Sequence, residues 1–125
     1  MLKIINVTFL TAYCSLIFWL SSQSSIPAPM LFTHQDKLIH LGAYFIMGIL
    51  AWRFFYDYFD KPKTVAILSL CFCSLYGVSD EWHQYYVPGR ETDVLDWMAD
   101  TLGASIALAA IQLGKKRVSD GRQAS

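Results

Sequence analysis

The sequence predicts an all-α membrane protein in which four transmembrane helices form one bundle. Hydrophobic residues make up 54% of the 125-residue chain, and they fall into four long runs at 4–20, 38–56, 64–79 and 97–113. A helix needs about 20 residues to cross the hydrocarbon layer of a bilayer. The segments between the runs are rich in Pro, Gly, Ser or charged residues, which are typical of turns. We therefore expect a multi-pass protein rather than a soluble domain.

The first run, 4–20, reaches the length of a span with help from its flanks. It could instead be the apolar core of a signal peptide, because Lys3 precedes it and a Ser-rich segment with Ala28 follows it. The run is long for such a core, so we favour a membrane span. The Ser- and Pro-rich segment 21–36 then predicts an extended connector.

The second run, 38–56, fits a span, whereas the third, 64–79, is short and needs interfacial anchors or a locally thinner bilayer. Only the short segment 57–63 joins these two runs, so we expect the two helices to be antiparallel neighbours.

In the fourth run, Ala99, Gly103 and Ala107 recur every four residues. This spacing allows two helix backbones to approach closely, although an ordinary Ala-rich helix would look the same. We expect residues 1–117 to form a single domain and the polar residues 118–125 to form a disordered tail.

Lys and Arg residues are unevenly divided between the two sides that four spans create. Eight of the ten fall on the side that holds both termini, and only Lys37 and Arg90 fall on the other. An excess of Lys and Arg marks the cytoplasmic side, so both termini are expected in the cytoplasm. Seven carboxylates fall on the outer side: Asp36, Asp80, Glu81, Glu91, Asp93, Asp96 and Asp100. The outer net charge is then −5, and nucleic-acid binding is not supported.

Polar side chains follow one face of the second span at its outer end. Asp36, His40 and Tyr44 are spaced by four residues, which places them on one side of a helix. Asp36 lies at the helix start, His40 about one turn deeper and Tyr44 about two turns deeper. A His in a membrane helix is often only an interhelical hydrogen-bonding contact, but its stacking with a carboxylate and a Tyr favours a functional site.

The third span ends in Asp80 and Glu81, and Gln84 lies one turn beyond Asp80. Pro88 and Gly89 then turn the chain back, and Arg90 follows at once. Its planar guanidinium either neutralises a neighbouring carboxylate or binds a phosphate or carboxylate ligand.

Three carboxylates descend one face of the fourth helix, because Asp93, Asp96 and Asp100 are spaced i, i+3 and i+7. Asp100 lies deepest, where an unpaired carboxylate is costly, so it should be protonated, paired or facing a wet cavity. Glu91 is off this face and is expected to be solvated. The three outer helix ends therefore predict one shallow polar pocket that opens toward the outer leaflet.

These residues, in this order, resemble the motifs of the VanZ-like family of small bacterial membrane proteins. The resemblance covers residues 36–105 and depends on two motifs: Asp36-Lys-Leu-Ile-His40 with Tyr44, and Asp80-Glu81-x-x-Gln84-x-Tyr-x-Pro-Gly-Arg90-x-x-Asp93-x-x-Asp96-x-x-x-Asp100-x-x-Gly103. It implies a multi-span helical protein of the bacterial cytoplasmic membrane, and the founding member of the family is associated with low-level teicoplanin resistance. Asp100 and Tyr86 depart from the pattern, which usually has Asn and Phe there.

Three functions fit these observations. The favoured one is binding or handling of an anionic envelope lipid or a lipid-linked cell-wall precursor, with Arg90 and Lys37 at the phosphate. The net outer charge of −5 opposes anion binding unless carboxylates are protonated or a divalent cation intervenes.

The second function is a metal-assisted hydrolase or transferase that acts on such a lipid. Asp80, Glu81, Asp93 and Asp96 would hold Mg²⁺ or Ca²⁺, and His40 would serve as general base. The third is purely structural, an ion-pair network that specifies the bundle. The sequence does not decide the ligand, the oligomeric state or any role in drug resistance.

Overall fold

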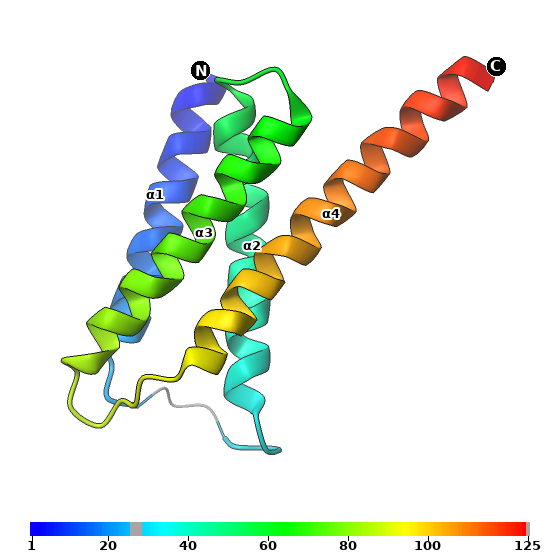
Figure 1. Ribbon diagram of the computed structural model, residues 1–125. Helices are drawn as coiled ribbons and strands as arrows, with labels where there is room; N and C mark the ends of the chain where they lie inside the picture. The colour runs from blue at the N-terminus through cyan, green and yellow to red at the C-terminus, as the bar shows by residue number, and fades with distance from the viewer. Residues whose placement is uncertain (26–28, 125) are drawn as a thin grey trace.

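A computed structural model describes residues 1–25 and 29–124, and these residues form four helices without a strand. The helices are α1 (Leu2–Ser21), α2 (Gln35–Tyr56), α3 (Pro62–Tyr85) and α4 (Val94–Ala124). Each is long and apolar enough to cross a membrane, which confirms the all-α, four-span prediction (Figure 1). Residues 26–28, in the middle of the predicted extended connector, lie outside the described residues.

α3 is longer than the hydrophobic run that predicted it. It begins with Pro62 in its first turn, where the missing N–H group has no helical partner to lose. It then continues through the polar segment 80–85, so it has 24 residues and spans about 36 Å at about 1.5 Å per residue. This length is sufficient to cross a bilayer. The hydrophobic run stops at residue 79, before the end of the helix, because the last turns of α3 contain the polar residues of the site.

The packing of α2 against α4 is the most extensive contact between helices. At Gly103 of α4, an added Cβ would collide with the carbonyl group of Leu41 on α2, with the carbonyl carbon at 2.9 Å. At Gly48 of α2, an added Cβ would lie 3.1 Å from the Cα atom of Ala104. The small residues of α4 therefore do permit close approach of two backbones, as in other membrane helix pairs.

α1 is attached to its neighbours by tyrosine hydroxyl groups. The Tyr13 hydroxyl donates to the carbonyl oxygen of Ala43 on α2 at 2.8 Å, and the Tyr76 hydroxyl on α3 donates to the carbonyl oxygen of Cys14 at 2.5 Å. The buried apolar side chains between the helices form two clusters. The larger one contains Leu10, Ile17, Tyr44, Met47, Ala51, Cys73 and Ala104, and the smaller one contains Trp52, Val65 and Leu108. Large apolar side chains such as Phe9, Leu75 and Leu102 are exposed, as expected for surfaces that face lipid.

The C-terminal segment differs from the disordered tail that the sequence predicts for residues 118–125. α4 continues as a helix to Ala124, and residue 125 lies outside the described part of the chain. Residues 113–124 are all exposed, and this half of α4 runs away from the other three helices (Figure 1). Adding residues to an existing helix is inexpensive, and the segment contains no Pro to stop it.

Candidate functional site

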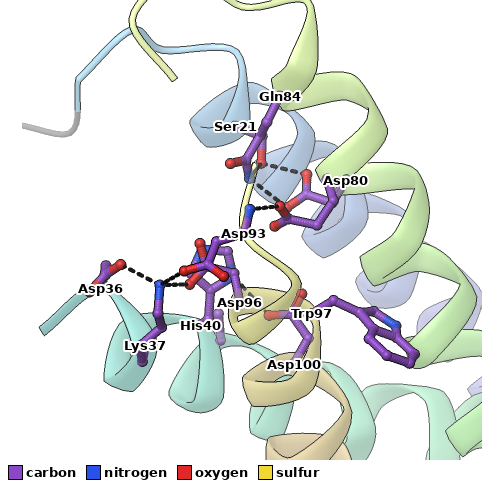
Figure 2. A network of polar contacts seen from close by, with 12 residues as sticks. Ser21, Asp36, Lys37, His40, Asp80, Gln84, Asp93, Asp96, Trp97 and Asp100 are labelled. Atoms are coloured by element: carbon purple, nitrogen blue, oxygen red, sulfur yellow. Dashed lines mark hydrogen bonds and ion pairs between the residues drawn. The ribbon is translucent and has the colours of Figure 1, made fainter. Parts of the chain in front are cut away.

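All four helices contribute to one end of the bundle, which we call the polar end. It combines the last turn of α1, the first turns of α2 and α4, the last turns of α3 and the turn before α4 (Figures 1 and 2). The turn depends on Gly89, whose φ of 82° is unfavourable for other residues. The predicted pocket residues lie at this end: Asp36, Lys37, His40, Tyr44, Asp80, Glu81, Gln84, Arg90, Asp93, Asp96 and Asp100.

Lys37 is the centre of an ion-pair cluster between α2 and the start of α4. Its Nζ atom lies 2.8 Å from a carboxylate oxygen of Asp36 and 2.7 Å from oxygens of Asp93 and Asp96 (Figure 2). The side chain of Asp96 is 9% exposed, so this contact is largely removed from water. Lys37 is therefore neutralised within the protein.

Asp93 also caps α4. Its Oδ1 atom accepts the backbone N–H group of Leu95 at 2.9 Å, and its carbonyl oxygen accepts that of Asp96. The ammonium group of Lys37 and the Leu95 N–H group both favour the ionised carboxylate, so they lower the pKa of Asp93.

His40 and Asp100 form a second contact between α2 and α4, deeper than the Lys37 cluster. The Nδ1 atom of His40 lies 2.8 Å from Oδ1 of Asp100, and its Nε2 atom lies 3.9 Å from Oδ2 of Asp96. Asp100 is completely buried, and its Oδ2 atom has no hydrogen-bond partner among the described residues. This oxygen faces α3 at Gly77, where an added Cβ would be 3.0 Å away.

Asp80 joins α3 to α1 through a buried hydrogen-bonded group. Its Oδ1 atom accepts the hydroxyl of Ser21 at 2.5 Å, and its Oδ2 atom accepts the amide of Gln84 at 3.1 Å (Figure 2). Asp80 is thus satisfied within the protein. Sequence reasoning missed Ser21, because one Ser at the start of a Ser-rich segment carries no signal of its own.

Two polar atoms between α2 and α3 have no hydrogen-bond partner within residues 1–25 and 29–124. Glu81 accepts the backbone N–H group of Asp93 through Oε2 at 3.0 Å, but its buried Oε1 atom is unpartnered. The hydroxyl of Tyr44 is also unpartnered, although the residue is 1% exposed. Buried polar atoms usually have partners, so these two indicate a place for a ligand, an ion or water.

Arg90 lines two adjoining cavities of the polar end. The inner cavity, of about 60 Å³, reaches Tyr44 and Asp80, and the outer one, of about 320 Å³, reaches Asp36 and Asp96. His40, Gln84 and Arg90 line both.

Arg90 has no carboxylate partner within 4.0 Å in the described part of the chain, and its buried Nε atom has no hydrogen bond. Among the described residues, the ion pairs with carboxylates of the polar end are therefore formed by Lys37 and not by Arg90. His83 and Glu91 also lie in this region. His83 packs against Phe18 and lies 2.9 Å from the hydroxyl of Ser22, and Glu91 is exposed at the rim of the outer cavity.

The residues that could share a metal ion are not the four that the sequence suggested. His40, Glu81 and Asp100 each offer one ligand atom, and these atoms lie within 4.8 Å of one another. Of the suggested set, only Glu81 belongs to this group. Asp80 is bonded to Ser21 and Gln84, and Asp93 and Asp96 are paired with Lys37.

A family model described as VanZ/LLP1 matches residues 3–115, which is nearly the whole chain. The chain belongs to the VanZ/LLP1 family. The match confirms the resemblance that the two motifs of the polar end indicate, and it covers α2 and α3 completely and most of α1 and α4. No curated protein and no solved structure matches the sequence.

Proposed function

We propose that this VanZ/LLP1 protein binds an anionic lipid, or a lipid-linked cell-wall precursor, in the bacterial cytoplasmic membrane. Its polar end faces the outside and both termini face the cytoplasm, in keeping with the eight-to-two division of Lys and Arg residues. The observation that carries the proposal is the unpaired guanidinium of Arg90, which lines both cavities.

Arg90 has the chemistry that a phosphate group requires. A guanidinium presents five N–H donors in a plane and binds phosphate through two parallel hydrogen bonds. Leaving its buried Nε atom without an acceptor is costly, and a bound phosphate removes that cost. Lys37 was expected to share this role, but three carboxylates already surround it. Arg90, and not Lys37, is therefore the residue expected to contact the phosphate.

The sizes and linings of the cavities favour a headgroup as their occupant. The outer cavity, of about 320 Å³, is near the lower limit of ligand pockets, so it suits a phosphate with a small substituent. The inner cavity of about 60 Å³ is too small for an acyl chain. It is bordered on one side by the apolar side chains of Ile17, Leu20 and Ile39. The acyl or prenyl chains would lie outside, along the exposed apolar faces of the helices.

Native mass spectrometry of the full-length protein in detergent tests the proposal, with phosphatidylglycerol, a polyprenyl phosphate and uncharged-headgroup lipid as probes. We expect Arg90→Ala to reduce retention of both phosphate lipids at least about tenfold, since a charged hydrogen bond contributes about 1.5–3 kcal/mol. Arg53→Ala is the matched control, because Arg53 is exposed at the opposite end. Equal retention by wild type and Arg90→Ala would overturn the proposal.

A link to teicoplanin resistance is a further part of this proposal, carried by family membership. In a host where the wild-type protein raises the teicoplanin inhibitory concentration, Arg90→Ala should abolish the increase at unchanged protein abundance. Loss of the phenotype together with loss of abundance would instead favour a purely structural role for the polar residues.

A metal-assisted lipid-modifying enzyme is the second candidate. The proximity of His40, Glu81 and Asp100 favours it, because these residue types bind catalytic metal ions in many hydrolases. Formation of a product from the retained lipid, detected in the same spectra, would distinguish an enzyme from a binding protein.

A further inference from the structure

We infer that His40, Glu81 and Asp100 form a binding site for one divalent transition metal ion of the zinc type. The three residues come from α2, α3 and α4, so the ion would join three helices at the polar end. The site does not depend on lipid binding, and it adds the class of metal to the second candidate function above.

The spacing of the ligand atoms suits a single ion. The three atoms lie within 4.8 Å of one another, and His40 Nδ1 and Asp100 Oδ1 are already 2.8 Å apart. With metal–ligand bonds of about 2.0–2.2 Å, neighbouring ligand atoms of a tetrahedral site are about 3.4 Å apart. Reaching this spacing requires His40 Nδ1 and Asp100 Oδ1 to separate by about 0.6 Å and the widest ligand pair to approach by up to about 1.4 Å, which small torsion changes of the side chains can provide.

Two unsatisfied carboxylate oxygens support the site independently. Oδ2 of Asp100 and Oε1 of Glu81 are buried and accept no hydrogen bond from any described residue. Asp100 is completely buried, so an unpaired charge there carries a large desolvation cost. One divalent ion balances both carboxylates. Gly77 has no side chain to crowd this oxygen, because an added Cβ there would lie only 3.0 Å from Asp100 Oδ2.

The mixture of donors selects the class of metal. Mg²⁺ and Ca²⁺ prefer six or more oxygen ligands, whereas imidazole nitrogen suits Zn²⁺ and its transition-metal neighbours. One imidazole and two carboxylates are three protein ligands, and zinc sites with three protein ligands keep a fourth position for water or substrate. His40 also lines the cavities that contain Arg90, so this fourth position would lie near the proposed phosphate.

The test is zinc binding by untagged, full-length protein in detergent after removal of metal with a chelator. We expect one Zn²⁺ per chain by elemental analysis and a higher melting temperature with Zn²⁺, but no comparable effect of equimolar Mg²⁺ or Ca²⁺. Glu81→Gln and Asp100→Asn keep the size of the side chain and should each weaken zinc binding at least about tenfold. Asp60→Asn, an exposed carboxylate in the loop at the opposite end, is the matched control and should bind like wild type.

Three results would overturn the inference. They are less than one-tenth of an equivalent of zinc in wild type, equal binding by Asp100→Asn and wild type, and a loss of binding in Asp93→Asn as large as in the two ligand variants. If Asp100→Asn does not fold, Glu81→Gln decides the question, because Glu81 is only half-buried. Arg90→Ala should keep full zinc binding, which separates failure of this site from failure of lipid binding.

Discussion

The two cations of the polar end are in opposite situations, although both lie among the same carboxylates. Lys37 has three carboxylate oxygens within 2.8 Å, whereas Arg90 has none within 4.0 Å among the described residues. Lys37 is in the first turn of α2 and faces the start of α4, which its ion pairs hold in place. Arg90 follows the turn at Gly89 and lies outside any helix. Lys37 therefore belongs to an ion-pair cluster that joins α2 to α4, whereas Arg90 is the cation that we propose binds a ligand.

We expect the largest loss of stability from a substitution that disturbs both the Lys37 cluster and the cavities around Arg90. Gly103→Leu places a side chain against the carbonyl group of Leu41, so α2 and α4 must move apart and the Lys37 cluster and the cavities lose their shape. Overpacking typically costs about 1–3 kcal/mol, and a backbone that cannot move aside brings the cost to the upper part of this range. Thermal unfolding in detergent and abundance in the membrane measure the loss.

Gly114→Leu is the matched control for that substitution. It adds the same side chain to the same helix, but a Cβ at Gly114 meets no atom within 4 Å. The two variants should differ by at least about 5 °C in melting temperature, given the usual relation between stability and melting temperature for a domain of this size. If both variants unfold at the same temperature, close approach at Gly103 does not hold the two helices together.

Replacing each cation in turn should have an intermediate effect on the free energy of unfolding, and this effect should differ between Lys37 and Arg90. Lys37→Met leaves Asp36, Asp93 and Asp96 without their cation and should destabilise the protein by about 1–3 kcal/mol, which is less than the loss for a completely buried ion pair. Arg90→Met breaks no ion pair and should change the free energy of unfolding by less than about 0.5 kcal/mol. Chemical denaturation in mixed micelles measures both.

Measuring stability and lipid retention for both variants shows which cation has a structural role and which one binds the ligand. Lys37→Met should keep the Arg90 contact to phosphate lipids while the protein remains folded, and Arg90→Met should lose it at full stability. If Arg90→Met destabilises the protein as much as Lys37→Met, Arg90 belongs to the structural network and the distinction between the two regions is wrong.

The sequence predicts the four helices and groups the polar residues at one end of the bundle, but it does not predict this division between Lys37 and Arg90. Hydrophobic runs predict four spans, and helical spacing correctly places His40 and Asp100 on facing sides of α2 and α4. The pairing of Lys37, in contrast, depends on how closely α4 approaches α2. That distance is set by the contact between Gly103 and Leu41, which lies outside the reach of local spacing. For the same reason the spacing of residues along each helix does not show that ligand atoms of His40, Glu81 and Asp100 lie within 4.8 Å of one another.

The smallest effect concerns the pH dependence of the Lys37 cluster. Lys37 and the Leu95 N–H group lower the pKa of Asp93 in the folded protein below its ordinary value of 3.8. A carboxylate with a lowered pKa stabilises the folded state above the ordinary value, and this contribution is lost as the pH falls toward the lowered value. Wild-type stability should therefore fall more steeply than that of Asp93→Asn below about pH 5.

The effect should be modest because Asp93 is at the exposed end of the cluster, where solvent and salt screen its charge. Melting temperatures of wild type and Asp93→Asn, recorded from pH 6 to pH 3 at low and high salt, measure it. The difference between the two proteins should shrink both at low pH and at high salt. Equal melting temperatures for the two proteins at every pH would mean that Asp93 acts through its cap on α4, which Asn also provides, and not through the charge of Lys37.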